Sequence, residues 1–135
     1  MVKLEPYLVG EQYKTDVWAA TSQVIGEMLK LAKKKRELVI RFRKLLEKCA
    51  QFGFSELPAN LMRNEGDAVY AIGDRRGPLL RAAGFFVEGE PKETFALMVF
   101  FEKHATKPRG NEKEQFRKLA RIRDDHQWTL VEETV

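Results

Sequence analysis

The fold of this chain depends on an apolar stretch that runs directly into a cationic one: Phe95-Ala-Leu-Met-Val-Phe-Phe101, then Glu102-Lys-His-Ala-Thr-Lys-Pro-Arg-Gly110. A short apolar run bounded by turn signals is typical of a strand that is buried on both faces. We therefore expect a central strand over residues 94–102. It would hold the side chains that follow it at one end of a sheet, and four of them are cationic or titratable: Lys103, His104, Lys107 and Arg109. Clustered positive charge of this kind suits a phosphate-rich partner.

Two more strands and a helix are expected around the central strand. Residues 68–72 and 79–87 are apolar runs separated by the turn-forming stretch Gly73-Asp-Arg-Arg-Gly-Pro78, which indicates a hairpin. After the central strand, Asn111 with Glu114 three residues later forms a pattern like a capping box. We therefore expect a helix that extends to about residue 125.

The N-terminal half is predicted to be helical. Between residues 37 and 52 the apolar side chains recur at three- and four-residue steps, and Gly53 provides a natural stop. An earlier helix is expected to begin at Thr21 or Ser22 and to continue through Leu31. The basic run Lys33-Lys-Lys-Arg36 marks the polar corner between the two helices.

These elements predict an α+β fold, in which a small antiparallel sheet packs on an N-terminal helical hairpin and a C-terminal helix follows. The length of 135 residues favours a single domain spanning residues 1–135. Within it, residues 1–12 are expected to form an irregular lead-in and residues 126–135 a tail. Residues 13–20 read either as a short strand or as part of an unbroken helix from residue 11.

The composition favours a folded protein with an anionic partner. The formal net charge is +4 and the pI is about 9.2. The single cysteine, Cys49, cannot form an internal disulfide and falls at an apolar helix position, so it is interpreted as a small buried side chain. No apolar run approaches a membrane span and the N-terminus lacks a signal-peptide core. We therefore expect a cytoplasmic protein that does not enter the membrane.

Neither a metal ion nor a cofactor is expected. The two histidines, His104 and His126, have no cysteine, aspartate or second histidine at ligand spacing. The glycines fit neither the P-loop nor the dinucleotide-binding spacing. Ser22 and Ser55 lie outside any motif that would indicate a catalytic triad.

Arg81 is the most informative of the remaining polar residues because it interrupts an apolar strand. A strand arginine is costly unless its head group reaches solvent or an anion, so we expect Arg81 on the exposed face of the sheet. A cross-strand pair with Glu102 is an equally open interpretation. His104 could serve as an acid or be a packed or solvated histidine with no task. Tyr70 could reach a nucleic-acid base or be half-buried packing.

Several segments carry a resemblance to a known family: residues 38–58, Val69-Tyr-Ala-Ile72, Leu80-Arg-Ala-Ala-Gly-Phe-Phe86, Leu97-Met-Val-Phe-Phe-Glu-Lys-His-Ala-Thr-Lys107 and the helix from Glu112. Together, over residues 22–125, they resemble the phage-associated HigB-like branch of the RelE/ParE toxin superfamily. In that branch the penultimate strand carries an arginine before an aromatic end, and Arg81 matches it. The family's usual Glu-hydrophobic-Arg ending on the first hairpin strand is replaced here by Ala71-Ile72-Gly73.

The resemblance implies a RelE-like fold and the toxin of a type II toxin–antitoxin module. Such a toxin is a ribosome-dependent mRNA endonuclease (mRNA interferase) that needs no metal and no cofactor. Its partners would be mRNA on the ribosome and a cognate helix-turn-helix antitoxin. Two alternatives stay open: a ParE-like gyrase inhibitor, and a catalytically inert mobile-element protein that keeps the fold for partner binding.

The resemblance also implies roles for individual residues. Arg81 would stabilise the negative charge of the transition state, Lys103 would hold phosphates beside it, and His104 would act as acid or base. These three form the expected catalytic set. The residues expected to bind RNA are Lys107, Arg75, Arg76, Arg109 and Tyr70.

Overall fold

The computed structural model describes residues 1–73, 80–103 and 110–132. Five of the residues singled out above lie outside the described residues: Arg75, Arg76, His104, Lys107 and Arg109.

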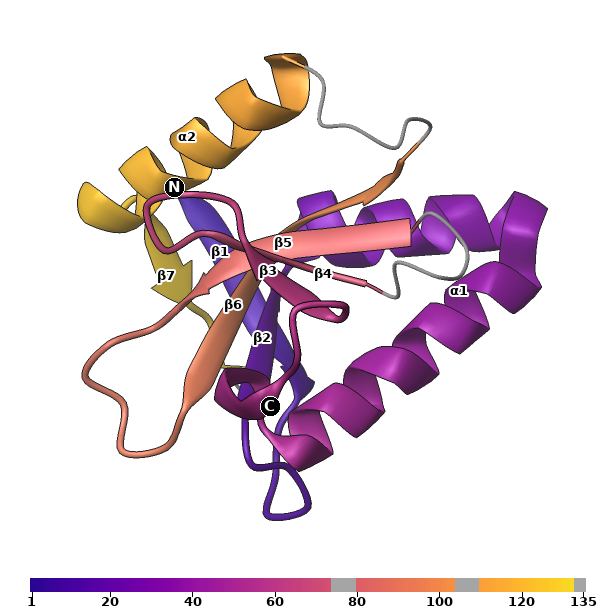
Figure 1. Cartoon of the computed structure of the whole chain (residues 1–135), viewed down its shortest axis with the longest axis horizontal. Helices are drawn as coiled ribbons and strands as arrows, with labels where there is room; N and C mark the ends of the chain where they lie inside the picture. The colour runs from indigo at the N-terminus through magenta and orange to yellow at the C-terminus, as the bar shows by residue number, and fades with distance from the viewer. Residues whose placement is uncertain (74–79, 104–109, 133–135) are drawn as a thin grey trace.

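The chain forms an α+β fold built on one mixed sheet (Figure 1). The strands are β1 (Val2–Leu8), β2 (Asp16–Ala20), β3 (Met62–Asn64), β4 (Tyr70–Ile72), β5 (Leu80–Phe86), β6 (Thr94–Glu102) and β7 (Trp128–Leu130). The helices are α1 (Glu27–Phe52) and α2 (Gly110–Asp124), with a π-helical turn η1 (Thr21–Gly26) before α1 and a 3₁₀ turn η2 (Phe54–Glu56) after it.

The sheet differs from the small antiparallel sheet that the sequence predicted. Its seven strands have the order β3-β4-β5-β6-β2-β1-β7, and two of its pairings, β2 with β6 and β1 with β7, are parallel. The meander β4-β5-β6 is antiparallel, as expected for the hairpins in this stretch. The prediction of a small antiparallel sheet is therefore wrong, because β1, β2, β3 and β7 extend it on both sides.

The expected irregular lead-in and tail each contain a strand. In β1 the apolar residues Val2, Leu4 and Leu8 alternate with Lys3, Glu5 and Tyr7, and Leu4 and Leu8 are buried, with 0% and 4% of their surface exposed. This alternation is the mark of a half-buried strand. Pro6 and Gly10 suggested irregular backbone instead, and the register of the β1–β2 pair does shift between Pro6 and Leu8. In the expected tail, residues 128–130 form β7 and pair with β1.

The helical hairpin is also corrected: the structure has one long helix, α1, with a kink. Lys35 alone has non-helical backbone angles inside it (φ −134°, ψ 56°). The kink therefore lies within the basic run of residues 33–36, which contains no glycine or proline. Lys35 Nζ lies 2.5 Å from Glu102 Oε2 at the end of β6, and this ion pair links the bend to the sheet.

The two helices cover opposite faces of β6. Phe100 packs against Phe42 of α1, with ring centroids 5.5 Å apart, whereas its neighbour Phe101 packs against Phe116 of α2 at 6.5 Å. Successive side chains of a strand point to opposite faces of the sheet. We refer to these as the α1 face and the α2 face.

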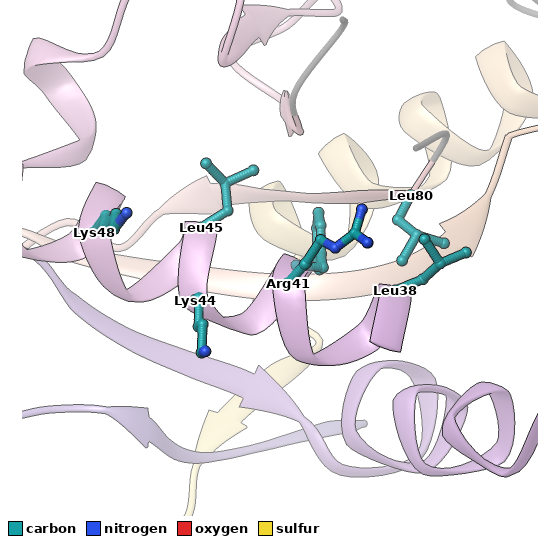
Figure 2. Close-up of a pocket in the computed structure, with 7 residues that line it drawn as sticks. Leu38, Arg41, Lys44, Leu45, Lys48 and Leu80 are labelled. Atoms are coloured by element: carbon teal, nitrogen blue, oxygen red, sulfur yellow. The ribbon is translucent and has the colours of Figure 1, made fainter. Parts of the chain in front are cut away.

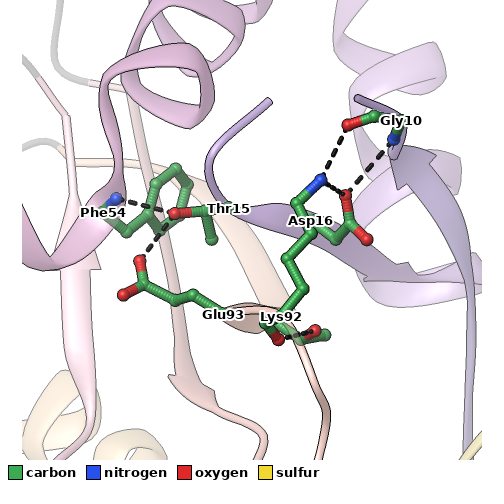
Figure 3. A network of polar contacts seen from close by, with 7 residues as sticks. Gly10, Thr15, Asp16, Phe54, Lys92 and Glu93 are labelled. Carbon is green, nitrogen blue, oxygen red and sulfur yellow. Dashed lines mark hydrogen bonds and ion pairs between the residues drawn. The ribbon is translucent and has the colours of Figure 1, made fainter. Parts of the chain in front are cut away.

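A polar network ties the far end of the sheet to the end of α1 (Figure 3). Thr15 is fully buried; its hydroxyl donates to Glu93 Oε1 at 2.6 Å and accepts from the Phe54 N–H at 2.8 Å. Beside it, Lys92 Nζ donates to Asp16 Oδ1 at 2.8 Å and to the Gly10 carbonyl at 2.7 Å. The side chains of this network satisfy backbone groups, so we assign it a structural role.

Burial raises the pKa of Glu93, but hydrogen bonds from Thr15, Ser55 and the Phe54 N–H outweigh it and lower the pKa below the ordinary 4.5. The folded protein therefore releases this proton more readily than the unfolded chain. The ionised Glu93 carboxylate therefore stabilises the folded protein at pH values above the pKa that Glu93 has in the unfolded chain. This stabilisation is lost as the pH falls through the lower pKa of Glu93 in the folded protein.

Thr15→Val is expected to lower the free energy of unfolding by about 1–3 kcal/mol, because it removes one partner each from a buried N–H and a carboxylate. Denaturant unfolding between pH 7 and pH 3 measures this. The difference between wild type and variant should shrink as Glu93 becomes protonated. A difference that stays constant over this range would contradict the assigned coupling.

Candidate functional site

The ends of β5 and β6 meet at one end of the sheet. Leu80, the first residue of β5, lies opposite Glu102, the last residue of β6. The two segments that carry Arg75, Arg76, His104, Lys107 and Arg109 in the sequence adjoin these strand ends. We call this region the cationic end of the sheet.

Arg81 is buried at this end, with 4% of its surface exposed, so the prediction that it marks an exposed face is wrong. Its Nη1 donates to the Leu80 carbonyl at 2.8 Å. The side chain lies against Gly73, where a Cβ atom would be 2.8 Å from Arg81 Cδ and 2.9 Å from Nη1. The same Cβ would lie 2.6 Å from the Leu80 carbonyl oxygen, so glycine at position 73 makes room for both the backbone of β5 and the arginine.

The register also decides the cross-strand alternative. Arg81 lies opposite Phe101, and Glu102 lies opposite Leu80. Neighbouring positions of a strand point to opposite faces, so Arg81 shares the α2 face with Phe101, whereas Glu102 lies on the α1 face and binds Lys35 there. The register therefore does not support the Arg81–Glu102 cross-strand pair considered from the sequence.

The other two described candidates are half-buried. Lys103 directly follows β6 and is therefore at the cationic end. Tyr70 packs its ring edge-on against Phe86, with centroids 5.4 Å apart, which agrees with the packing interpretation. Tyr70 pairs with Gly84, whereas Arg81 lies toward the other end of β5. The structure thus places Arg81 and Lys103 at the same end and Tyr70 away from it.

Sequence reasoning missed a groove on the α1 face beside Leu80 (Figure 2). It has a volume of about 320 Å³ and is lined by Leu38, Arg41, Phe42, Lys44, Leu45, Lys48 and Leu80. Arg41 extends along α1 toward Leu80, and Lys44 leaves the helix on the side away from Leu45 (Figure 2). We call this the basic groove. The only signal for it in the sequence is the spacing of these cations on the helix, which is also typical of solvated helix surface.

The remaining chemistry is limited among the described residues. Cys49 is buried, which confirms its interpretation as a packed side chain, and burial raises the pKa of its thiol to about 11. Within residues 1–73, 80–103 and 110–132, no group of three or more histidine, cysteine, aspartate or glutamate side chains could hold a metal ion.

Among the described residues, no helix combines the length and apolar character that crossing a membrane requires.

Comparisons with known proteins give no relative for this chain. No protein-family model, no curated protein and no solved structure matches it.

Proposed function

We propose that this chain is the toxin of a type II toxin–antitoxin module and cleaves mRNA on the ribosome without a metal ion. The observation that carries the proposal is the pairing of Leu80 with Glu102, which brings the start of β5 and the end of β6 to one end of the sheet; in the sequence, both adjoin cationic segments. The sequence resemblance over residues 22–125 supports the same reaction.

In this reaction the RNA 2′-OH attacks the adjacent phosphate and the 5′-oxygen leaves, which gives a 2′,3′-cyclic phosphate. The reaction needs a group that accepts the 2′-OH proton, a group that stabilises the extra negative charge and a group that protonates the leaving oxygen. We assign charge stabilisation to Arg81, phosphate binding to Lys103 and Lys107, and acid or base work to His104. Burial holds the Arg81 guanidinium in place before the substrate arrives.

A second candidate is a protein that binds a partner without catalysis. The burial of Arg81 and its bond to the Leu80 carbonyl favour this second candidate, because both indicate that the side chain stabilises the fold. The toxin reading requires substrate phosphate to reach that guanidinium at the cationic end.

Expression in bacteria without an antitoxin is expected to arrest growth with translation-dependent cleavage of messages. Growth curves and mapping of mRNA 5′ ends, with and without a translation inhibitor, measure this. Arrest of replication with intact messages would identify a gyrase inhibitor. Unimpaired growth at confirmed expression would identify the non-catalytic binding protein.

RNA or ribosome binding by the purified protein is expected to weaken steeply with salt, because each neutralised phosphate releases counterions. With about four phosphate contacts to single-stranded RNA, the logarithm of the association constant should fall by about three for each tenfold rise in salt. Binding that ignores salt would contradict phosphate recognition.

A further inference from the structure

We propose that the basic groove binds an acidic amphipathic helix of a partner protein. This inference is independent of the proposed function, because the groove is on the α1 face whereas Arg81 is on the α2 face. Three properties of the groove carry it: its apolar floor, its cationic rim and the absence of acidic side chains among its described lining residues.

The floor of the groove is apolar and is made by two elements. Leu38 and Leu45 are half-buried on α1, and Leu80 is buried at the start of β5. Leu38 and Leu45 are seven residues apart, which is two helical turns, so they form a row about 10 Å long. A row of this length accepts apolar side chains spaced at i, i+3 or i+4, and i+7 on a docked helix.

The rim supplies the charge. Arg41, Lys44 and Lys48 are exposed, and none of the described residues that line the groove is acidic. Elsewhere on α1 the cations have acidic neighbours, as Lys30 has Glu27 and Lys35 has Glu102. Within the part of the chain that the structure describes, the three rim cations form no ion pair. Carboxylates that flank the apolar row of a docked helix would complement them.

Single-stranded RNA fits this groove less well. Proteins that bind single strands combine positive charge with aromatic rings on which bases stack. The aromatic ring in the lining is Phe42, and only 5% of that residue is exposed. An apolar floor of leucines leaves the bases without such a platform, so we commit to a helical peptide.

The test uses the full chain and a synthetic peptide of about four helical turns, with leucines at i, i+3 and i+7 and glutamates at the flanking positions. A peptide of the same composition in scrambled order controls for charge, and an oligouridine labelled in the same way tests RNA. Fluorescence anisotropy measures binding, and circular dichroism measures helix gained by the peptide in the mixture.

Arg41→Glu with Lys48→Glu is expected to weaken binding of the patterned peptide by about tenfold or more. The matched control is Lys33→Glu with Lys34→Glu, which changes the net charge equally at exposed α1 positions outside the groove and should alter affinity by less than about threefold. Leu45→Asn should weaken binding without changing charge. Thermal melts of all variants establish that they fold.

Three results would overturn the proposal. These are absence of binding by the patterned peptide, equal binding of the scrambled peptide, and equal losses in the groove and control variants. Tighter binding of oligouridine that displaces the peptide and is lost in the groove variant would assign the groove to RNA instead.

Discussion

Gly84→Ala is expected to lower the free energy of unfolding by about 4 kcal/mol or more, or to prevent folding altogether. A Cβ atom at position 84 would lie 1.7 Å from the carbonyl oxygen of Ala96 and 2.8 Å from its carbonyl carbon. These are backbone atoms of β6, so no side-chain rotation can relieve the overlap, and the strands would have to separate. The pairing at risk is β5 with β6, at the centre of the meander that leads to the cationic end.

Gly26→Ala is the matched control. Gly26 has helical angles (φ −60°, ψ −42°), and a Cβ there meets its nearest atom, the Thr21 carbonyl oxygen, at an ordinary 3.5 Å. This variant should be neutral or stabilise by up to about 1 kcal/mol, because alanine restricts the unfolded chain more than glycine does. Denaturant unfolding measures both variants. Similar stabilities for the two would show that β5 and β6 can move apart at low cost.

Gly84 also illustrates what the sequence could not reveal. The residue lies beside an irregularity in the β5–β6 register, where Ala83 faces Val99 but Gly84 faces Leu97. The boundaries of β6 followed from its apolar run, because a strand buried on both faces needs no alternation. The close approach at Gly84 depends on how two strands pair, and no local pattern encodes that register.

The wrong parts of the fold prediction have a similar origin. The alternating pattern of β1 was present, but its strand is stabilised by distant partners, β2 and β7. The run at residues 33–36 was predicted as a corner, and the bend does occur at Lys35. The helical residues on both sides of Lys35 form the single kinked helix α1. The sequence thus indicated where the chain bends. It did not indicate that the bend is a kink at the single residue Lys35 within one long helix and not a corner between two helices.

The candidate site was predictable only in part. The apolar run of β6 correctly placed Lys103 at the end of a central strand. The burial of Arg81 was not predictable, because it requires Gly73 from the neighbouring part of the sheet to leave space for the guanidinium. The basic groove was missed because Leu80, which closes its floor, is more than thirty residues away from Leu45 in the sequence. Both features arise from tertiary packing.

Arg81→Met is expected to abolish toxicity if the proposed reaction is correct. Loss of a preorganised positive charge at a phosphoryl transition state costs about 3–4 kcal/mol, which corresponds to a rate lower by about 10² to 10³. Methionine retains much of the apolar volume of the buried arginine stem, and the missing bond to the Leu80 carbonyl should cost about 1.5–3 kcal/mol of stability. Growth after induction, mapping of mRNA ends and a thermal melt of the purified protein are measured together.

Arg81→Lys separates charge from geometry in the same assays. Lysine keeps the positive charge but cannot reproduce the planar guanidinium that donates to the Leu80 carbonyl, so we expect partial toxicity and a cleavage rate between those of wild type and Arg81→Met.

Lys103→Met, at a half-buried position after β6, should weaken RNA binding with little effect on the thermal melt. If Arg81→Met folds and remains as toxic as wild type, Arg81 has a structural task alone, to which its bond to the Leu80 carbonyl and its fit against Gly73 contribute.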